Sequence, residues 1–172
     1  MPPDRGRPAL FDAVVISQFI TGDAIELLAH TFERRWLLWQ VRRELEAYHL
    51  DTSQILSLEV PGAFTFISLP EDLATSRKYL ELRGTMHIGA GEAATLTYAS
   101  FHDVIVVCNG QPALRSYCRA RGIACLTTAD ILRHCHEQGL LTTEAGDAFV
   151  ARTHVRGGHP CCPSFADLIA AP

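Results

Sequence analysis

The sequence lacks a long apolar run, a surplus of positive charge and the motifs of several common catalytic sites. Nothing in it approaches the roughly 20 apolar residues that a membrane span requires, and no apolar signal core follows Arg5 and Arg7. We find no P-loop, no dinucleotide-binding glycine motif and no recognisable Ser-His-Asp arrangement. The formal charge is -4, so any binding of nucleic acid must depend on a local patch or on metal ions. We expect a cytoplasmic protein with no membrane partner.

Cysteine is present, but it has no framework spacing. The six cysteines are Cys108, Cys118, Cys125, Cys135, Cys161 and Cys162. Because no secretory signal is apparent, we expect these thiols to be reduced rather than paired.

Histidine and cysteine gather towards the end of the chain, where zinc is an alternative to a plain Gly/Pro-rich tail. The candidate ligands are His134, Cys135, His136, His154, His159, Cys161 and Cys162. Their spacing matches neither a zinc finger nor a zinc ribbon, and adjacent cysteines are poor chelate partners. The tail interpretation is favoured.

The composition is that of one globular domain. The chain has 172 residues, of which 48% are hydrophobic and 20% charged. Short apolar runs alternate with helical spacing, which indicates an α/β fold with a mostly parallel central sheet flanked by helices. The expected strands are 9–12, 36–38, 63–69, 104–107 and 123–126, and the expected helices are 25–32, 40–48, 71–82, 92–99, 112–121 and 129–138. We place one domain at 1–150 and a Gly/Pro-rich tail with a short terminal helix at 151–172.

Four polar residues fall where a parallel sheet gathers its ligands, near the carboxyl ends of the strands. Asp12 ends the first strand, Asn109 follows the continuous β-branched run at 104–107, Glu92 lies in the first turn of a helix and Glu44 lies in an earlier helix. Clustered carboxylates need a counter-charge, and Mg²⁺ or Mn²⁺ takes oxygen ligands. Such ions can activate water for phosphodiester cleavage.

Each of the four also has a plain structural interpretation. Asp12 could be a surface acid at a strand end, and Glu92 could be a charge that favours the start of a helix. Glu44 could belong to a solvated helix face, and Asn109 with Gly110 is a turn signal. These alternatives fall together if the four side chains share one site.

Four stretches in order resemble the PIN-domain family, which includes the VapC-like toxins of toxin–antitoxin pairs. They are LFDAVVISQF, VRREL, GAGEAATLTYA and VIVVCNGQPALRSYCRARGIACLTTADIL, and the resemblance spans residues 9–140. It implies a PIN-like three-layer fold and metal-dependent endonuclease activity, usually on RNA. By the same resemblance Asp12, Glu44, Glu92 and Asn109 are the catalytic positions, with Asp12, Glu92 and Asn109 on Mg²⁺ or Mn²⁺.

Two positions depart from the family pattern. Asn109 stands where the family usually has a fourth acid, and Val14 stands where a polar residue commonly supports the first acid. An Asn oxygen can bind a metal ion, but it adds no charge and cannot act as a general base. Asp103 precedes the strand at 104–107, so it should lie at the wrong end of that strand to replace the missing acid.

Arginines flank an aromatic pair earlier in the chain. Arg34, Arg35, Arg42 and Arg43 surround Trp36 and Trp39. Arginine beside an aromatic ring can bind single-stranded RNA. A core position or a subunit contact for the two tryptophans, with the arginines in water, is the favoured alternative.

The sequence therefore predicts a PIN-type ribonuclease with weakened activity, acting on RNA, with a cognate antitoxin protein and a homodimeric state implied by the resemblance. The main alternative is a non-catalytic module that binds RNA or a protein partner, which Asn109 and Val14 favour. A third interpretation keeps only the fold and makes the pocket a site for a small phosphate ligand.

Overall fold

The strands form one parallel sheet with β1 at its centre. The computed structural model describes residues 4, 6–47, 50–109, 112–155 and 162–170. Within them the strand order is β3-β2-β1-β4-β5, and every neighbouring pair is parallel. The strands are β1 Ala9–Phe11, β2 Arg35–Leu38, β3 Thr65–Ile67, β4 Ile105–Val107 and β5 Ala124–Leu126.

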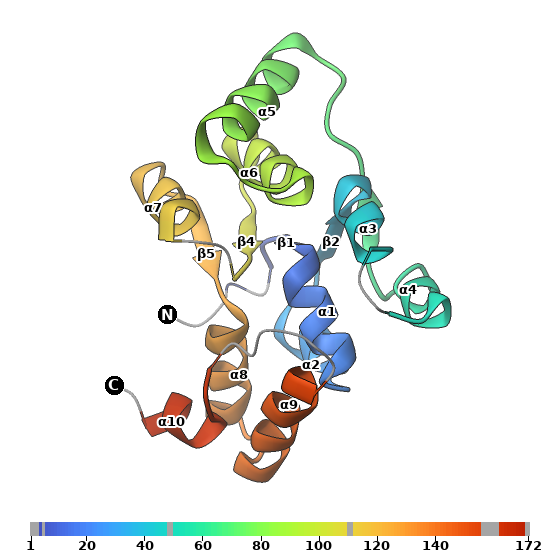
Figure 1. The fold of residues 1–172 in the computed structure, drawn as a ribbon, viewed down its shortest axis with the longest axis vertical. Helices are drawn as coiled ribbons and strands as arrows, with labels where there is room; N and C mark the ends of the chain where they lie inside the picture. Colours follow the sequence, from blue (N-terminus) through green and yellow to red (C-terminus); the bar gives the residue numbers. More distant parts are fainter. Residues whose placement is uncertain (1–3, 5, 48–49, 110–111, 156–161, 171–172) are drawn as a thin grey trace.

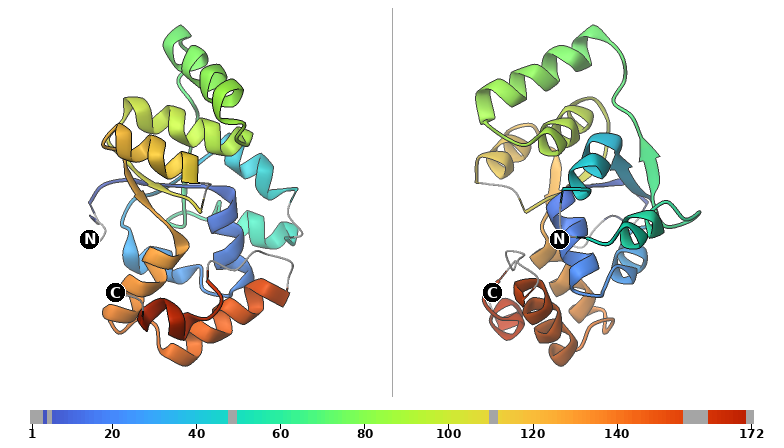
Figure 2. Two further views of the ribbon diagram at one scale, coloured as in Figure 1. Left: turned by 60° about the vertical axis from the view of Figure 1, so that its left-hand side comes forward. Right: turned by 45° about the vertical axis from the view of Figure 1, so that its right-hand side comes forward.

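Helices cover both faces of the sheet, which confirms the expected α/β class (Figures 1 and 2). The helices α5, α6 and α7 lie on one side, and α1, α2, α8, α9 and α10 lie on the other. The bounds are α1 Ala13–Thr21, α2 Glu26–Thr31, α3 Trp39–Leu45, α4 Thr52–Ser57, α5 Leu73–Met86, α6 Ala90–Phe101, α7 Pro112–Ala120, α8 Thr128–Glu137, α9 Thr143–Val155 and α10 Phe165–Ala170. No helix among the described residues is long and apolar enough to cross a membrane.

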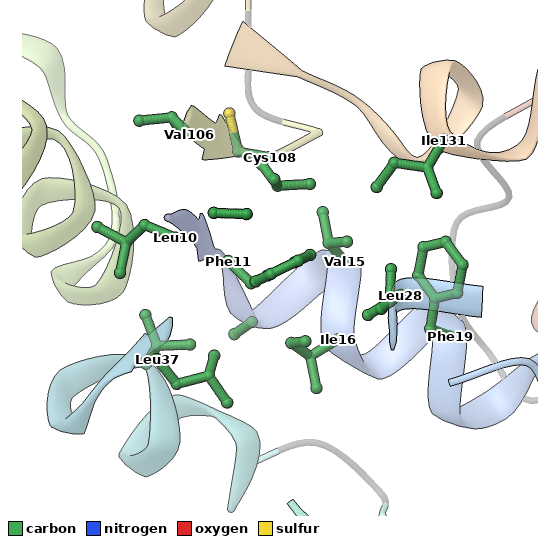
Figure 3. Packing of buried hydrophobic residues seen from close by; sticks show 14 of the residues in the cluster. Leu10, Phe11, Val15, Ile16, Phe19, Leu28, Leu37, Val106, Cys108 and Ile131 are labelled. Atoms are coloured by element: carbon green, nitrogen blue, oxygen red, sulfur yellow. The ribbon is translucent and has the colours of Figure 1, made fainter. Parts of the chain in front are cut away.

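The central strands are buried on both faces, as parallel strands between two helical layers must be. All three residues of β1 are fully buried, and β4 is nearly so. Leu10, Leu37 and Val106 pack on one side of the sheet, while Phe11 packs towards α1 (Figure 3). The ring of Phe11 meets that of Phe32 edge to face, with 5.4 Å between the ring centroids. Packing around β1 therefore fixes where its last residue and the following helix begin.

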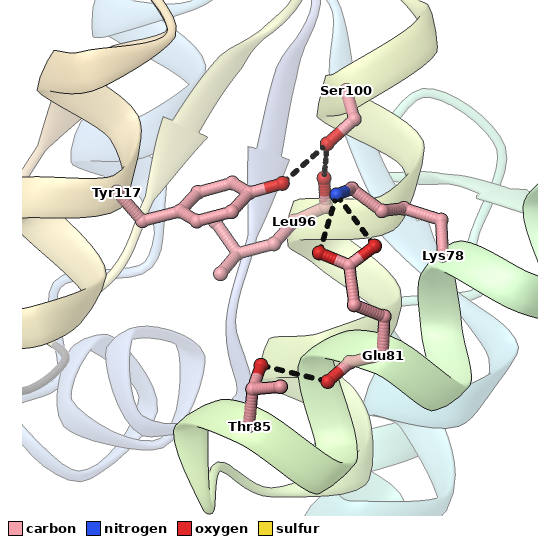
Figure 4. Close-up of polar contacts among 6 residues, drawn as sticks. All are labelled: Lys78, Glu81, Thr85, Leu96, Ser100 and Tyr117. Atoms are coloured by element: carbon pink, nitrogen blue, oxygen red, sulfur yellow. Dashed lines mark hydrogen bonds and ion pairs between the residues drawn. The ribbon is translucent and has the colours of Figure 1, made fainter.

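Polar contacts connect α5, α6 and α7, the three helices that lie on the same side of the sheet. Lys78 on α5 donates to both carboxylate oxygens of Glu81 and lies 5.7 Å from the ring centroid of Tyr117 on α7 (Figure 4). The hydroxyls of Tyr117 and Ser100 on α6 are 3.0 Å apart. These contacts hold α5 and α7 against α6, the helix that carries Glu92.

The sequence did not predict three of the observed helices, and each omission has a physical reason. In α1 the polar Ser17 and Gln18 interrupt the apolar pattern, yet both are buried. In α9 the buried positions have helical spacing, but Gly146 and Thr153 occupy two of them and disguise the pattern. The short α4 has one buried residue, Ile55, and so offers no periodicity. The domain boundary expected at residue 150 falls within α9.

The contact between α9 and α10 supplies a test of the packing. A methyl group added at Gly146 would overlap the ring of Phe165, whereas one added at Gly84 in α5 would meet nothing within 4 Å. We expect Gly146→Ala to lower the free energy of unfolding by about 1–3 kcal/mol. Gly84→Ala, the matched helical control, should raise it by about 0.5–1 kcal/mol. Urea denaturation of both variants measures the difference, and equal shifts would contradict this packing.

Candidate functional site

Asp12 begins the site because the chain passes from β1 to α1 without a connecting loop. Its backbone N–H donates to Val107 O at 2.9 Å, so it extends the pairing of β1 with β4 by one residue. It is also the residue that precedes the first turn of α1. Its side chain is only 2% exposed. The acid at the end of the first strand is thus a buried residue at the carboxyl edge of the sheet.

Three carboxylates line one pocket beside this edge. Asp12, Glu44 and Glu92 surround a cavity of about 320 Å³, together with Val14, Ala47 and Gly89. Its described lining contains no lysine or arginine. Three of the four candidate residues therefore share a site, which has negative charge and no basic side chain in its lining.

The electrostatics of Asp12 reflect this arrangement. Burial, followed by the charges of Glu92 and Glu44, raises the pKa of Asp12 from 3.8 to about 7, against the opposing effect of the N–H groups of Ala13 and Val14. Val14 lines the pocket but has no polar group to offer. In this state Asp12 is partly protonated at neutral pH, and a nearby cation would favour its ionised form.

Glu44 reaches the start of α6 and is held there. Its Oε1 accepts a hydrogen bond from the N–H of Gly91 at 2.7 Å. A Cβ at position 91 would overlap the Glu44 carboxylate, and one at position 89 would lie 3.2 Å from its Oε1. Gly91 therefore leaves the space that the Glu44 carboxylate occupies, and a side chain at position 89 would make a tight contact with it. The N-terminal end of a helix also favours a negative charge.

Glu92 has a second contact at the same helix start. Its Oε2 accepts from the N–H of Gly89 at 3.1 Å, which completes a capping arrangement. Glu92 therefore does two things: it caps the start of α6, and it lines the carboxylate pocket. The other carboxylate oxygen has no such backbone contact among the described hydrogen bonds.

Asn109 lies at the same sheet edge but takes part in a different cluster. Its Nδ2 donates to Gln18 Oε1 at 2.6 Å and to Thr128 Oγ1 at 2.8 Å, and its Oδ1 accepts from the N–H of Thr128 at 2.9 Å. Thr128 Oγ1 donates to Gln18 Oε1 at 2.7 Å. This network ties α1 to the start of α8. Asn109 is not among the residues that line the carboxylate pocket.

Gln18 and Thr128 were missed by sequence reasoning. Both are buried polar residues, 3% and 0% exposed, and both contact Asn109. Ninety-one positions separate Gln18 from Asn109, so no local pattern could have paired them. Asp103 lies at the opposite end of β4 and is exposed, where it pairs with Arg7 at 2.6 Å.

The carboxylate oxygens of the pocket are the kind of ligand that hard divalent cations bind. Carboxylate oxygens are the ligands that Mg²⁺ and Mn²⁺ take, and Mg²⁺ is commonly held by one or two carboxylates with water completing its shell. Among the described residues no three His, Cys, Asp or Glu side chains are placed to hold one ion together. Glu44 and Glu92 each use one carboxylate oxygen to accept a hydrogen bond from a glycine N–H at the start of α6.

The other metal candidate gathers no support in the described part of the chain. Cys135 is buried and contacts Thr31, and His136 Nδ1 contacts Leu141 O at 2.9 Å. His159 and Cys161 lie outside the described residues.

The arginines and tryptophans that the sequence places close together have different contacts in the structure. Trp36 packs edge to face with Tyr98, and Arg35 donates to three backbone carbonyls. Arg42 pairs with Glu46 and Glu59. Trp39 is 44% exposed and lies with Arg43 along a groove of about 500 Å³, on the same helix as Glu44.

The raised pKa of Asp12 predicts how stability depends on pH. Between about pH 4 and pH 7 the folded chain keeps a proton on Asp12 that the unfolded chain has lost. The free energy of unfolding should therefore fall as pH rises through this range. Asp12→Asn cannot ionise, so it should lose this part of the pH dependence and exceed the wild type above pH 7, by on the order of 4 kcal/mol at most. Urea titrations in a chelator measure this, and a pH-independent difference would contradict it.

A comparison with known protein families identifies the family of the chain. No curated protein and no solved structure matches the chain significantly. A family model described as PIN domain matches residues 8–153, which include the described strands and the four site candidates Asp12, Glu44, Glu92 and Asn109. The chain therefore belongs to the PIN-domain family, nuclease-type modules that bind nucleic acid and generally use divalent metal ions.

Proposed function

We propose that the chain is a metal-dependent endoribonuclease of PIN type and the toxin component of a toxin–antitoxin pair. The observation that carries the catalytic part is the pocket in which Asp12, Glu44 and Glu92 meet without a basic residue in its lining. Such a concentration of negative charge is costly unless a cation binds there. The antitoxin partner and the homodimeric state follow from the resemblance to VapC-like toxins.

Asp12 and Glu92 are the residues proposed to hold Mg²⁺ or Mn²⁺. The ion would supply an activated water and stabilise the leaving oxygen of the RNA phosphodiester. Burial of Asp12 at the start of α1 keeps its carboxylate in one place and limits its contact with water. Glu44 positions the start of α6, and with it Glu92, through its bond to Gly91.

Asn109 has a different part in this proposal from an ordinary fourth acid. Its Oδ1 and Nδ2 are both bonded within the network of Gln18 and Thr128. We assign it the neutral fourth position of the site, where it positions the carboxyl ends of β4 and β5. Ligation of the ion by its Oδ1 would require the bond from Thr128 to be released.

The groove beside the pocket supports RNA as the substrate. Trp39 and Arg43 are exposed side chains four residues apart on α3, and the ring of Trp39 packs on Phe66 with 4.9 Å between centroids. An aromatic ring next to a guanidinium suits an unstacked base and a phosphate. Because α3 also carries Glu44, a strand bound in this groove would lie next to the carboxylates.

A non-catalytic module that binds RNA is the second candidate, and the Asn109 network favours it. The amide is satisfied by neutral partners, so this cluster is stable without a metal ion. The site would then lack the charge that the fourth acid supplies.

Cleavage of a mixed RNA pool distinguishes the two functions. With Mn²⁺ the wild type should cut, and Asp12→Asn and Glu92→Gln should each lower the rate at least about 100-fold. Glu46→Gln is the control, because Glu46 follows α3, is exposed and pairs with Arg42 outside the pocket. Its rate should equal that of the wild type.

Asn109→Asp separates the remaining outcomes. If only this variant cuts, natural catalysis has been lost and the binding module is correct. Fluorescence anisotropy with labelled RNA in a chelator then measures binding without cleavage. Failure of every variant to cut, together with no RNA binding, would contradict both candidates.

A further inference from the structure

Three cysteines that are distant in the sequence meet between β4, β5 and α7. Cys108 follows β4, Cys125 is the middle residue of β5 and Cys118 lies on α7. The Sγ atoms of Cys108 and Cys125 are 3.7 Å apart, and the thiol of Cys118 is also hydrogen-bonded to Cys125. This cluster of thiols lies outside the carboxylate pocket and has no part in the proposed RNA cleavage.

The three thiols differ in their access to solvent. Cys108 and Cys118 are buried, at 1% and 0% exposure, whereas Cys125 is half-buried. Cys125 borders a cavity of about 480 Å³ together with Ala124, Leu126 and residues of α8, whereas its thiol lies on the α7 side of β5, beside Cys118. Arg7 and Arg133 also line this cavity, together with Asp130. Of the three thiols, that of the half-buried Cys125 is therefore the one that a small polar molecule from solvent meets first.

The contacts of Cys125 favour its thiolate. Hydrogen bonds from Cys108 and then Cys118 lower the pKa of Cys125 to about 4, with a smaller contribution from Arg115 and against burial and Asp130. The same hydrogen bond, with burial, raises the pKa of Cys118. These contacts favour the thiolate on Cys125, the most exposed of the three thiols, and a thiolate is the reactive form of cysteine.

We propose that Cys125 is a peroxide-reactive thiol and that Cys108 is the partner that closes a disulfide with it. In the first step the Cys125 sulfur attacks one oxygen of hydrogen peroxide, the O–O bond breaks, and Cys125 becomes a sulfenic acid as hydroxide leaves and takes up a proton. In the second step the Cys108 sulfur attacks the Cys125 sulfur, and the sulfenic oxygen leaves as water. Two thiols and one peroxide thus give one disulfide and two waters.

The geometry favours Cys108 as this partner. A disulfide requires the two sulfur atoms to move from 3.7 Å to about 2.05 Å apart. Cys108 lies just beyond the last residue of β4, at a strand end rather than within a helix, and its N–H donates to Leu126 O at 2.9 Å. Cys118 lies in α7, and a shift there would move a helix that packs on β5.

Mass spectrometry of the full chain tests this proposal. The chain is treated with a small excess of hydrogen peroxide at pH 7, remaining thiols are blocked with N-ethylmaleimide, and the digest is analysed without reduction. We expect a linked pair of peptides that contain Cys108 and Cys125. In Cys108→Ser, dimedone should instead trap a sulfenic acid on Cys125.

Cys135→Ser is the matched control, because Cys135 is another buried thiol and contacts Thr31 rather than a cysteine. It should form the Cys108–Cys125 link as the wild type does. In the untreated chain, alkylation of Cys125 by iodoacetamide should be at least about tenfold faster than that of Cys118. Equal alkylation rates, a different linked pair, or no link in the wild type would overturn the proposal.

Discussion

The strand β1 is paired on both edges and buried on both faces, and it runs directly into a carboxylate that water barely reaches. The other parts of the site are arranged around this constraint. Asp12 cannot turn away from the sheet edge, because its own N–H is bonded to Val107 and α1 begins at the next residue. Two further acids approach the same point and make its ionisation less favourable. The fold therefore stores an electrostatic cost at one place, as sites that bind cations commonly do.

The start of α6 compensates part of this cost. Glu44 and Glu92 each accept a hydrogen bond from a glycine N–H there, and the positive end of the helix dipole lies beside both. Gly91 leaves the space that the Glu44 carboxylate occupies. The pKa of Asp12 is raised despite the N–H groups of Ala13 and Val14, so the charge imbalance of the pocket is concentrated on the residue that is least able to move.

Sequence reasoning found the parts of the site that have local signals. An apolar run closed by an acid identified β1 and Asp12, and the β-branched run at 104–107 identified β4. The same reasoning could not find contacts that depend on the completed fold, such as Glu44 with Gly91 or Asn109 with Gln18. It also missed α1 and α9, since Gln18, Gly146 and Thr153 stand on buried helix faces where an apolar residue is expected. A polar residue is tolerated there when it is hydrogen-bonded, and a glycine when a ring fills the space.

The strand order also has a consequence for the chain as it leaves the ribosome. The next two strands, β2 and β3, assemble on one side of β1, while its other edge stays unpaired until β4, which begins at Ile105. Until then the growing chain presents an unpaired edge on a strand whose side chains are all apolar, the kind of surface that chaperones bind and that aggregates form upon. Pairing with β4 closes that edge and brings Asp12 to its final place in the same event, so the nascent protein cannot have a complete carboxylate pocket before the sheet is closed.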